Sequence, residues 1–546
     1  MPKVCQASKS VAAISGEEGS RLPSPVNLDA LLAELEGYDP IIIAQLRLGF
    51  LSGFDLGFRG TPNSNEKVKN LSSAYENPEV VNKYLNSEID SSRIIGPFDR
   101  PPFSNFQINP LGVVPKKESG KFRIINDLSN PAGDSINDKI DRVFTEVQYA
   151  SVLDAVDLVS RNGPGCYLAK SDIQKAFRLL PVRPDQRNLL GMVWEGSFYF
   201  DCCLPMGASS SCQLFERFSS AVEFMANKRG VRYINHYLDD FLLANTSKES
   251  CQADLDCFKQ LCSDLHVPLA IDKTVGPSQI LVYLGFEFNT VNTTVSLPQE
   301  KLSKAQSLIS QVLSCKRPQV SQLMSLLGLL SFSCSVIRPG KVFLRRLYAL
   351  IAGKPQHYSV RLTLEHRLDL NMWLEFLEGY NGIDFFEDVL AHRGLPLNIY
   401  TDASQSLGFG ALFRNSWFSI PWPSGWWSEQ NITLLEFIPV VLAIEAWGSI
   451  LSNRAVIVNI DNNSLVSVIN SQTSKEPLVL LLLRRLVLTS LKLNIQLISL
   501  HIAGTDNKSA DLLSRLQVAD FKQNHPTADE SPTEVPNLPP YLASKC

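Results

Sequence analysis

Acidic residues at the ends of apolar runs constrain this chain more than any other sequence feature. Residues 167–172 form an apolar run that ends on Asp172, and residues 235–243 carry Asp239 and Asp240 between two apolar segments. Acids inside apolar strands are unfavourable unless a cation compensates their charge. Divalent metal ions bind oxygen ligands, and a pair of them supports phosphoryl transfer, so the pattern favours a metal site. Two acids in a hairpin turn are often simply solvated, and that alternative stays open here.

Length and composition exclude several classes of protein. The 546 residues correspond to roughly three to five domains, each able to bury a core, which rules out a single small binding module. With 45% apolar and 19% charged residues, the chain is not disordered, collagenous or of low complexity. The formal charge of −4 argues against a uniformly basic nucleic-acid coat protein.

Sequence features that report on the compartment point to the cell interior. Residues 1–20 lack the continuous apolar stretch of a secretory signal peptide. The most apolar runs, 323–337 and 478–488, are too short to span a bilayer. The 11 cysteines show neither a C-x-x-C pair nor zinc-binding spacing, which fits reduced core thiols. We therefore expect a soluble intracellular protein of the cytoplasm, the nucleus or both, without a membrane partner.

The first half of the chain divides at about residue 95. Residues 1–95 are polar and turn-rich around one apolar segment, and they show no chemistry. Residues 96–290 alternate short apolar runs with helical patterns, which predicts an α+β sheet domain. Its expected elements are a hairpin over 111–115 and 122–128, strands over 166–173 and 280–288, a helix over 210–229 and a second hairpin over 233–244.

Residues 291–394 form a basic helical region. Apolar residues recur there at helical spacing, and residues 301–364 contain ten Lys and Arg but no Asp or Glu. Since the whole chain carries −4 and this stretch +10, the remaining residues carry −14. A charge run is usually a solvated helix face, but the missing acids favour a phosphate-binding surface. We predict nucleic-acid contacts from four of these residues: Arg338, Lys341, Arg345 and Arg346.

A second set of acids lies in residues 395–516. Strands are expected over 397–402, 407–413, 455–461 and 495–501, with a helix over 433–450. Asp402 and Asp461 end strands, while Glu436 and Asp511 lie on helices, so the four can converge on two metal ions for phosphodiester hydrolysis. Taken singly, each is an ordinary cap or turn residue. The proline-rich residues 517–546 are predicted to be a tail.

Residues 96–290 resemble the reverse transcriptase family in several motifs that stand in the family's order. Gly-Val-Val-Pro-Lys-Lys-Glu-Ser-Gly-Lys-Phe-Arg (112–123) is similar to the fingers hairpin, and Ser-Asp-Ile-Gln-Lys-Ala-Phe (171–177) to the first palm motif. Leu-Pro-Met-Gly-Ala (204–208) is similar to the template-and-nucleotide motif and Tyr-Leu-Asp-Asp (237–240) to the catalytic hairpin. The resemblance implies an α+β right-hand polymerase with fingers, palm and thumb.

This resemblance implies RNA-directed DNA synthesis from an RNA template, a DNA primer and deoxynucleoside triphosphates. Asp172 and Asp239, with Asp240 beside them, would bind two Mg²⁺ ions, and the primer 3′-hydroxyl would attack the α-phosphate in line. Mn²⁺ accepts the same oxygen ligands. The basic residues of the fingers hairpin would neutralise the triphosphate; these are Lys116, Lys117, Lys121 and Arg123.

Further positions take their roles from the same resemblance. Phe177 would crowd the sugar 2′-position and select deoxynucleotides, or else be an ordinary core residue. Lys273 would donate a proton, or else be a solvated surface lysine. Met206 and Gly207 belong to the nucleotide motif, with Met206 standing where many retroviral relatives carry glutamine. Leu284-Gly285-Phe286 resembles the primer grip.

Residues 395–516 resemble ribonuclease H in the order and approximate spacing of Asp402, Glu436, Asp461 and Asp511. The resemblance implies an α/β ribonuclease H-like domain that holds two Mg²⁺ ions and cleaves the RNA strand of RNA–DNA hybrids. His501 would assist product release or be a structural residue at a strand end, and Asn462 would contact the hybrid backbone. Four tryptophans are expected to be packing residues rather than a stacking platform; they are Trp417, Trp422, Trp426 and Trp427.

Polymerase, basic helical thumb and connection, then ribonuclease H is the layout of retroelement Pol proteins. Leu204-Pro-Met-Gly, residues 236–242 and residues 337–347 look most like the tyrosine-recombinase retrotransposons of the DIRS and Ngaro type. Because no aspartic-protease triplet, integrase zinc pattern or recombinase set is present, integration is expected to need a separate element-encoded protein or a segment missing from this sequence. A domesticated or decayed copy that binds nucleic acid without catalysis is the alternative, and a telomerase-like enzyme is disfavoured because it lacks a ribonuclease H.

Overall fold

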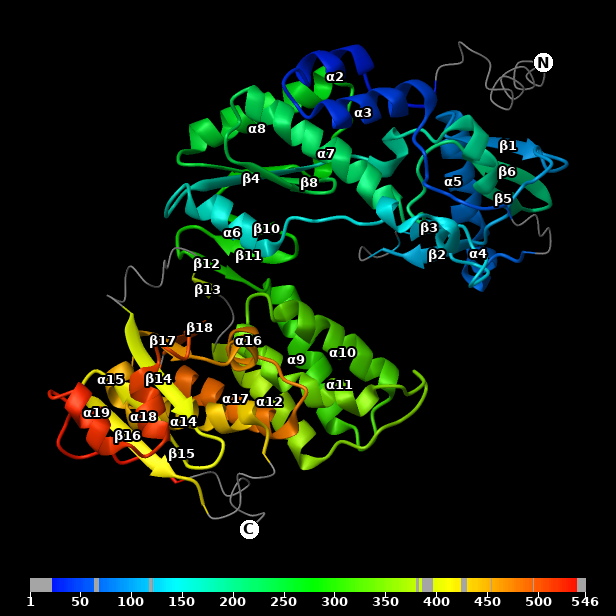
Figure 1. The fold of residues 1–546 in the computed structure, drawn as a ribbon. Helices are drawn as coiled ribbons and strands as arrows, with labels where there is room; N and C mark the ends of the chain where they lie inside the picture. The colour runs from blue at the N-terminus through cyan, green and yellow to red at the C-terminus, as the bar shows by residue number, and fades with distance from the viewer. Residues whose placement is uncertain are drawn as a thin grey trace. The chain divides into compact units, whose positions relative to one another are not determined.

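The computed structural model describes residues 22–62, 68–116, 120, 122–379, 383–384, 396–423, 430–452, 454–493 and 495–537. The chain forms two compact units (Figure 1). The first comprises Met1–Leu284 with Thr290–Asn292, and the second comprises Gly285–Asn289 with Thr293–Cys546.

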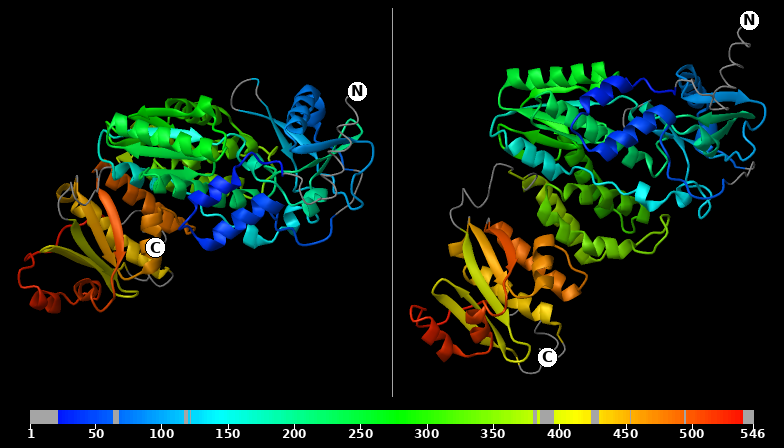
Figure 2. Two further views of the ribbon diagram at one scale, coloured as in Figure 1. Left: turned by 90° about the horizontal axis from the view of Figure 1, so that it is seen from above. Right: turned by 45° about the horizontal axis from the view of Figure 1, so that its top comes forward.

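The central sheet of the first unit carries four strands in the order β7-β8-β4-β9. Two amphipathic helices, α7 (Ser211–Lys228) and α8 (Lys248–Asp264), cover one face of this sheet (Figure 1), and the right-hand view of Figure 2 shows the same layering. The buried faces of both helices form one core with the inward residues of β4 and β8, as the apolar runs predict. The strand bounds are Ile234–Tyr237 for β7, Asp240–Asn245 for β8, Tyr167–Asp172 for β4 and Val275–Ser278 for β9.

Two smaller sheets also belong to the first unit. One is antiparallel and consists of β1 (Ile94–Phe98), β6 (Ser197–Asp201) and β5 (Gly191–Trp194). The other is a hairpin of β2 (Leu111–Pro115) and β3 (Phe122–Asn126), in which Pro115 pairs with Phe122. The hairpin predicted from alternating residues is confirmed, although its second strand ends at Asn126 rather than at residue 128.

Helices from the N-terminal region complete the core of the first unit. α2 (Leu28–Glu34) and α3 (Pro40–Ser52) contribute buried leucines and a phenylalanine to the core that α7 and α8 share. α4 (Ser72–Glu76) packs on β2, and α5 (Pro78–Asp90) packs on β1. The sequence shows no role for this region because the surfaces that its helices cover come from distant parts of the chain.

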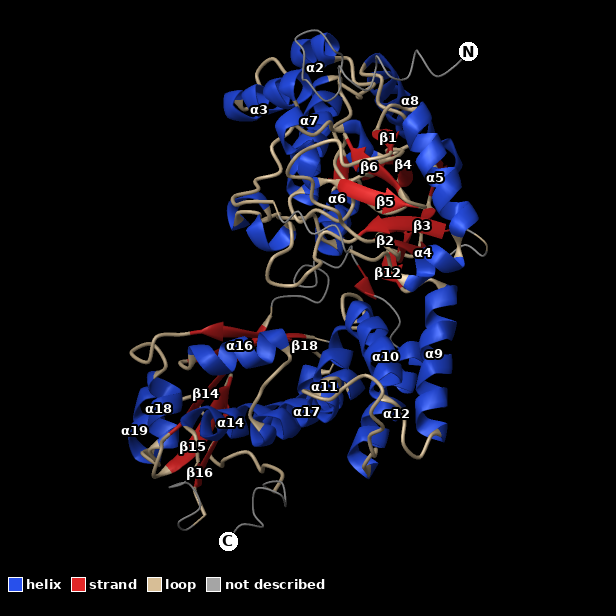
Figure 3. Ribbon diagram, turned by 90° about the vertical axis from the view of Figure 1, so that its right-hand side faces the viewer, coloured by secondary structure: helices blue, strands red, loops and turns tan. Residues whose placement is uncertain are grey.

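Helices dominate the first part of the second unit, as the spacing of residues 301–364 predicts. They pack against one another and against the 3-10 helix η6 (Arg338–Phe343) (Figure 3). The helices are α9 (Gln299–Ser314), α10 (Val320–Ser333), α11 (Arg345–Ile351) and α12 (Leu364–Gly379). The same unit holds an antiparallel sheet of β11 (Phe286–Asn289), β12 (Thr294–Ser296) and β13 (Ile383–Asp384).

The single strand predicted over residues 280–288 is in fact two strands, β10 (Ile280–Tyr283) and β11. The strand is interrupted at Leu284 and Gly285, whose φ angles of 48° and 79° lie in the left-handed region. Extended backbone cannot pass through that region, so the chain turns there. Leu284 is the last residue of the first unit before the division, and Gly285 opens the second.

Five strands form the α/β sheet of the second unit, in the order β16-β15-β14-β17-β18. β14 runs parallel to β17, and β17 runs parallel to β18, while β15 and β16 are antiparallel additions. α14 (Ile432–Ala446) and α18 (Lys508–Ser514) both pack on β14 and β15 from opposite faces (Figure 3). The strands are β14 (Leu397–Ala403), β15 (Gly408–Phe413), β16 (Ser416–Pro421), β17 (Ala455–Ile460) and β18 (Gln496–His501).

The segment predicted to be a proline-rich tail packs on this α/β sheet for much of its length. α19 (Val518–Asn524) contributes the fully buried Phe521, whose ring centre lies 5.5 Å from that of Trp417. Further along, the backbone amide of Thr533 donates to the Trp417 carbonyl at 2.7 Å. The apolar Phe521 therefore fixes residues that proline content alone marked as a tail.

A helix that could cross a membrane, being both long enough and sufficiently apolar, is not found in the described part of the chain.

A buried histidine in β7 links stability to pH. His236 Nδ1 lies 2.5 Å from Glu223 Oε2 and Nε2 lies 3.2 Å from Glu216 Oε1, both on α7. Burial alone would lower the pKa of His236, but the two glutamates raise it to about 9. The protonated histidine thus stabilises the fold fully below its unfolded pKa of about 6.5, and this contribution disappears as the pH rises through 9.

We predict that wild-type protein loses about 2–3 kcal/mol of unfolding free energy between about pH 6.5 and pH 9.5 relative to His236→Gln. Urea denaturation of both proteins at several pH values measures this difference. His357→Gln, which removes an exposed histidine, is the matched control and should follow the wild-type curve. Parallel curves for wild type and His236→Gln would contradict the prediction.

Candidate active sites

The register of the central sheet brings the three acids of the first constellation together. Asp172, at the end of β4, pairs with Asp240, at the start of β8. β7 and β8 are joined by Leu238 and Asp239, and Leu238 takes a left-handed conformation with φ 53° that makes the tight turn. The Asp239 carbonyl accepts a hydrogen bond of 2.9 Å from the Ile173 amide, which fixes the turn beside the end of β4.

Burial and neighbouring negative charges make Asp239 and Asp240 reluctant to be charged. Burial raises the pKa of Asp239, and the charge of Asp172 raises it further. Burial, followed by the charges of Asp172 and Asp239, raises the pKa of Asp240 to about 6. A cation placed among the three would reverse this cost, because an opposite charge favours the ionised form.

Lys273 supplies one such cation. It closes the 3-10 helix η5 (Ile271–Lys273), and its Nζ lies 2.7 Å from Asp172 Oδ2. Burial alone would lower the pKa of Lys273, but the hydrogen bond to Asp172 and the charges of Asp239 and Asp240 raise it. The structure therefore places this lysine at the acids, although its side chain is 57% exposed.

The chemistry of the three acids fits divalent metal ions. In the described residues, no group of three or more His, Cys, Asp or Glu side chains has its donor atoms already gathered for an ion. Asp172 is also engaged with Lys273. The acids nevertheless offer oxygen donors only and lie in a buried cluster, where the pKa values of Asp239 and Asp240 stay raised despite the nearby cations Lys273, Lys170 and Arg123. Small side-chain rotations of the acids would therefore be needed to receive an ion.

Phe177 lies in the 3-10 helix η3 (Ala176–Leu179), a few residues after Asp172, and is half buried. Its ring packs edge-to-face on Phe215, with 5.4 Å between ring centres, so it borders the core as the ordinary interpretation expects. This 3-10 helix is held by Lys175, the residue before it with a φ of 54°, and by its own Arg178. Both contact the buried Glu88 of α5 at 3.1 Å, and Arg178 also lies 2.6 Å from Asp201.

Glu88 is a residue that sequence reasoning missed. Its side chain is 4% exposed and also pairs with Arg93 at 2.7 Å, so it neutralises several cations in the interior. Burial would raise the pKa of Glu88, but these cations lower it to about 2. The sequence does not indicate that Glu88 is buried and paired, because its partners Arg93, Lys175 and Arg178 lie outside its helix.

The nucleotide-motif residues lie beside the fingers hairpin. A Cβ atom on Gly207 would lie 2.2 Å from the carbonyl oxygen of Asn126, at the end of β3, so only glycine fits there. Met206 is 52% exposed. Arg123, exposed on β3, is close enough to the acids to lower the pKa of Asp239 slightly. Lys116 is exposed at the hairpin tip, while Lys117 and Lys121 lie outside the described residues.

The predicted primer-grip residues are tied to both neighbouring segments. Tyr283 Oη, just before Leu284, donates to the Asp240 carbonyl at 3.1 Å. Lys301 Nζ donates to the Gly285 carbonyl at 2.8 Å and lies 3.8 Å from the ring centre of Phe332. The Gly285 carbonyl is therefore held by a cation that the sequence assigned to the basic surface.

The four predicted nucleic-acid contacts have different surroundings. Arg345 is exposed, and Arg338 and Lys341 are exposed residues that line a cavity of the second unit. Arg346 Nη1 lies 3.0 Å from Glu365 Oε2. Because that acid is the residue just beyond the acid-free stretch 301–364, the sequence count overstates the charge that Arg346 presents to a partner.

The α/β sheet places the second set of acids at neighbouring positions. Asp402 lies in β14, and Asp461 directly follows β17, the strand parallel to it. Glu436 lies in the second turn of α14 and Asp511 in the first turn of α18. α18 is held against β14 by the side chain of Asn507, which donates to the Thr401 carbonyl at 3.0 Å.

The pKa shifts of Asp402 and Glu436 show that these acids lie close enough to repel one another. Burial raises the pKa of Asp402 to about 6, and the charges of Asp461 and Asp511 add to it. Burial raises the pKa of Glu436 to about 8, with contributions from Asp461 and Asp402. Glu436 Oε2 is buried and accepts no hydrogen bond from any residue that the structure describes, which is a costly arrangement that an ion would satisfy. The oxygen donors therefore fit divalent metal, although the exposed Asp511 is paired with Arg515 at 2.7 Å.

The accessory residues of this sheet are divided between surface and core. His501 is exposed at the end of β18, opposite Ile460. Asn462 caps α16 (Asn463–Ser471) through the Leu465 amide. Trp417 and Trp422 are 3% and 6% exposed, which confirms the expected packing role; Trp426 and Trp427 lie outside the described residues.

Comparison with known proteins defines the class of the first unit. Residues 114–288 match the family model described as reverse transcriptase (RNA-dependent DNA polymerase). This stretch contains the three acids, Lys273 and the residues of the nucleotide motif. This part of the chain is therefore similar to the reverse transcriptase domains of retroviral Pol proteins.

Among curated proteins, the chain is similar to foamy-virus polyproteins. The Pro-Pol polyprotein of Feline foamy virus is 24% identical over 245 residues, which are 45% of this chain and 20% of that protein. The Pro-Pol polyprotein of Simian foamy virus type 1 is 21% identical over 245 residues, 45% of this chain and 19% of that protein. The match therefore spans about a fifth of the length of these relatives.

A solved structure extends the likeness in fold to most of the chain. It is described as the foamy viral protease-reverse transcriptase dRH in complex with double-stranded DNA. The two chains superpose with a TM-score of 0.51 at 16% sequence identity, over 89% of this chain and 84% of that one. The predicted polymerase fold of mixed α and β structure is thereby confirmed.

Proposed function

We propose that this protein is the RNA-directed DNA polymerase of a retroelement, with a ribonuclease H activity in its α/β sheet. One observation carries the proposal: Asp172, Asp239 and Asp240 converge beside Lys273 within a reverse transcriptase domain. The expected substrates are an RNA template, a DNA primer, deoxynucleoside triphosphates and RNA–DNA hybrid. The foamy viral protein of similar fold was solved with double-stranded DNA, which supports nucleic acid as the partner.

In this proposal, the polymerase residues divide the work of nucleotidyl transfer. Asp172 and Asp239 would hold two Mg²⁺ ions, which lower the charge barrier to attack on the α-phosphate. Lys273 Nζ, kept protonated by the surrounding acids, would hold a proton for the leaving pyrophosphate. Arg123 and Lys116 would neutralise the triphosphate, and Leu284 with Gly285 would support the primer end.

The hydrolytic residues act on the hybrid in the proposed second activity. Asp402, Glu436, Asp461 and Asp511 would hold two Mg²⁺ ions, which supply an activated water and stabilise the leaving oxygen. The buried, unpartnered Glu436 Oε2 supports this role, because an ion would remove its unfavourable burial. His501, exposed at the strand end, is free of the core and fits the proposed role in product release.

The domain limits, the type of retroelement and the cellular location are also proposed, on the basis of the motif residues. The domain limits are those of the sequence: 96–290 fingers and palm, 291–394 thumb and connection, and 395–516 ribonuclease H. The DIRS or Ngaro type of retrotransposon, an intracellular location and a separate integration protein complete the proposal. A decayed, non-catalytic copy is the second candidate, and the intact acids of both constellations disfavour it.

Primer extension on an RNA template tests the polymerase, and release of labelled RNA from a hybrid tests the ribonuclease. Both activities should require Mg²⁺ or Mn²⁺ and disappear in EDTA.

Hybrid binding should weaken steeply with salt, and charge reversal at Arg345 should reduce affinity more than reversal at Arg346, which is already paired. Hybrid binding with no metal-dependent extension or cleavage by the intact chain would establish the non-catalytic candidate instead.

Phe177→Val tests the proposed selection against ribonucleotides. Removing the ring opens space for a 2′-hydroxyl, so we expect the preference for dNTP over rNTP to fall by about 10–100-fold in kcat/KM. Phe177→Tyr keeps the bulk and should retain the preference. Equal selectivity in Phe177→Val and wild type, with both proteins folded, would restore the interpretation of Phe177 as a core residue only.

A further inference from the structure

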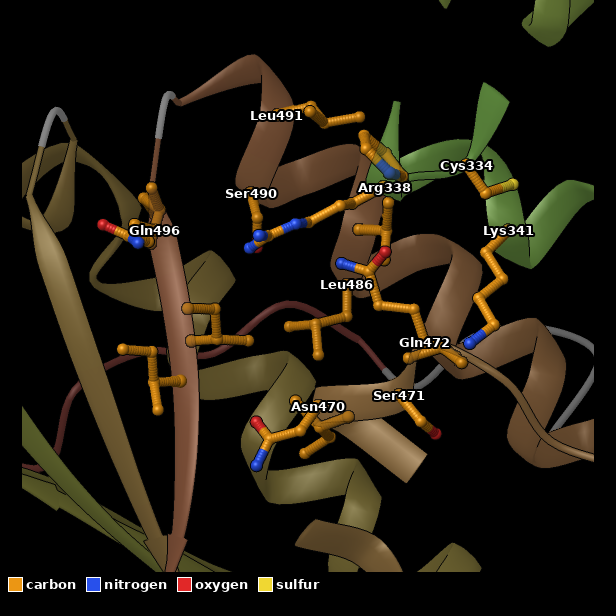
Figure 4. Close-up of a pocket in the computed structure, with 17 residues that line it drawn as sticks. Cys334, Arg338, Lys341, Asn470, Ser471, Gln472, Leu486, Ser490, Leu491 and Gln496 are labelled. Atoms are coloured by element: carbon orange, nitrogen blue, oxygen red, sulfur yellow. The ribbon is translucent and has the colours of Figure 1, made fainter. Parts of the chain in front are cut away.

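A cavity of about 550 Å³ lies inside the second unit, between the helical part and the α/β sheet (Figure 4). Its walls come from the segment around η6 and from α16, α17 (Pro477–Lys492) and β18. Its volume is in the range of small-molecule sites, roughly 300–1,000 Å³.

The two sides of this cavity are firmly joined. Arg484 of α17 forms an ion pair with the fully buried Asp369 of α12. The Arg484 guanidinium also lies 4.6 Å from the ring centre of Phe343 in η6. These contacts join α17 and η6, the two elements from which Leu486 and Arg338 line the cavity.

The cavity combines apolar walls with a cationic rim. Leu486, Val487, Ile495 and Leu497 line it, and none of its lining residues is an Asp or a Glu. The side chains of Arg338 and Lys341 make no hydrogen bond or ion pair with any residue that the structure describes. Two unneutralised cations beside apolar walls favour an anion that carries an apolar or planar body.

Polar atoms without partners lie among these walls. Ser490 is 9% exposed, and its buried Oγ makes no hydrogen bond with any residue that the structure describes. Figure 4 shows the Arg338 side chain extending toward Ser490. Gln472 ends α16 in the left-handed conformation, with φ 51°, and its buried Oε1 has no hydrogen-bond partner in the part of the chain that the structure describes. In Figure 4 the Gln472 amide points into the cavity. Buried polar atoms are nearly always paired in folded proteins, so these atoms indicate a missing ligand.

We propose that this cavity binds a small phosphate-bearing molecule with a planar body, of the nucleoside monophosphate class. Arg338 and Lys341 bind the phosphate, Leu486 and Val487 pack on the ring system, and Gln472 Oε1 accepts from an amino or hydroxyl group. A fatty acid would leave the Gln472 oxygen without a donor. Inorganic phosphate would leave the apolar walls uncovered. The site is independent of both acid constellations.

Isothermal titration of the full-length chain in EDTA tests the proposal, because EDTA removes metal-dependent nucleotide binding at the acid sites. Adenosine 5′-monophosphate is the probe, with adenosine, inorganic phosphate and octanoate as comparison ligands. We expect saturable binding of the monophosphate at one site, and at least about tenfold weaker binding of each comparison ligand. The monophosphate should also raise the melting temperature, since it binds the folded state.

Variants locate the binding site. Arg338→Gln should weaken binding of the monophosphate at least about tenfold, as should the volume-filling Ser490→Leu. Lys354→Gln removes an exposed cation of the same basic region that does not line the cavity, and it should bind like wild type. Circular dichroism establishes that each variant is folded.

Two results would overturn the proposal. One is the absence of saturable monophosphate binding in EDTA, or binding that Arg338→Gln leaves unchanged. The other is complete displacement of the monophosphate by RNA–DNA hybrid, together with an equal loss of hybrid affinity in Arg338→Gln. That outcome would assign Arg338 and Lys341 to the nucleic-acid surface instead.

Discussion

Asp239→Asn should reduce primer extension by about 10³-fold or more, because losing one ligand of a two-metal site removes several kcal/mol of charge stabilisation. Asp239 stands in the tight turn beside Asp172 and is largely buried, so an amide in its place cannot recruit a replacement oxygen donor from solvent. Single-turnover extension on an RNA template, at saturating nucleotide, measures the chemical step directly.

We expect Asp239→Asn to lose primer extension but not cleavage of RNA–DNA hybrid. Asp239→Asn should cleave RNA–DNA hybrid at the wild-type rate, because the hydrolytic acids lie in the second unit. Asp256→Asn, which removes a 60%-exposed acid on α8, should extend normally. Extension by Asp239→Asn within tenfold of wild type would show that the acid is not a ligand, and the polymerase mechanism would have to be abandoned.

Glu436→Gln should abolish hybrid cleavage, with a loss of about 10³-fold, while leaving primer extension intact. The same change should stabilise the metal-free fold at neutral pH. Burial raises the pKa of Glu436 to about 8, so the folded state disfavours the charged form at any pH above the ordinary value of 4.5. A neutral amide of the same shape removes that penalty.

Opposite effects on activity and stability distinguish a ligand from a structural residue. Urea denaturation in EDTA should show a higher midpoint for Glu436→Gln than for wild type, and Mg²⁺ should stabilise wild type more than the variant. Asp520→Asn on α19 is the matched control with an exposed acid and should change neither property. Normal cleavage by Glu436→Gln, or a lower midpoint in EDTA, would remove Glu436 from the proposed site.

Local patterns were sufficient for much of the fold. The alternation of apolar residues predicts the β2–β3 hairpin and the strands around Asp172 and Asp239, and the structure has them within one or two residues. Period-two and helical patterns act within a few residues, where backbone geometry fixes which side chains share a face. They failed at Leu284 and Gly285, where a turn interrupts an apolar run that looks continuous.

Contacts between residues far apart in the sequence could not be predicted from the sequence. Nothing in the proline-rich C-terminal segment indicates that Phe521 packs beside Trp417, since that contact depends on where β16 lies. Likewise, the acid-free stretch 301–364 ends one residue before Glu365, which neutralises Arg346 across a turn of the chain. Composition counts charges but cannot tell which of them are already paired.

The sequence by itself determined the class of fold and the acids that end strands, because strand and helix periods are local properties of the chain. Only the tertiary structure decided that Lys273 lies at Asp172 and that Glu88 anchors Lys175 and Arg178 behind Phe177. These ion pairs join residues about 90 to 100 positions apart and form only once the sheets and helices are packed. Because the acids of these pairs, Asp172 and Glu88, are buried, they interact with the cations more strongly than two fully solvated charges would.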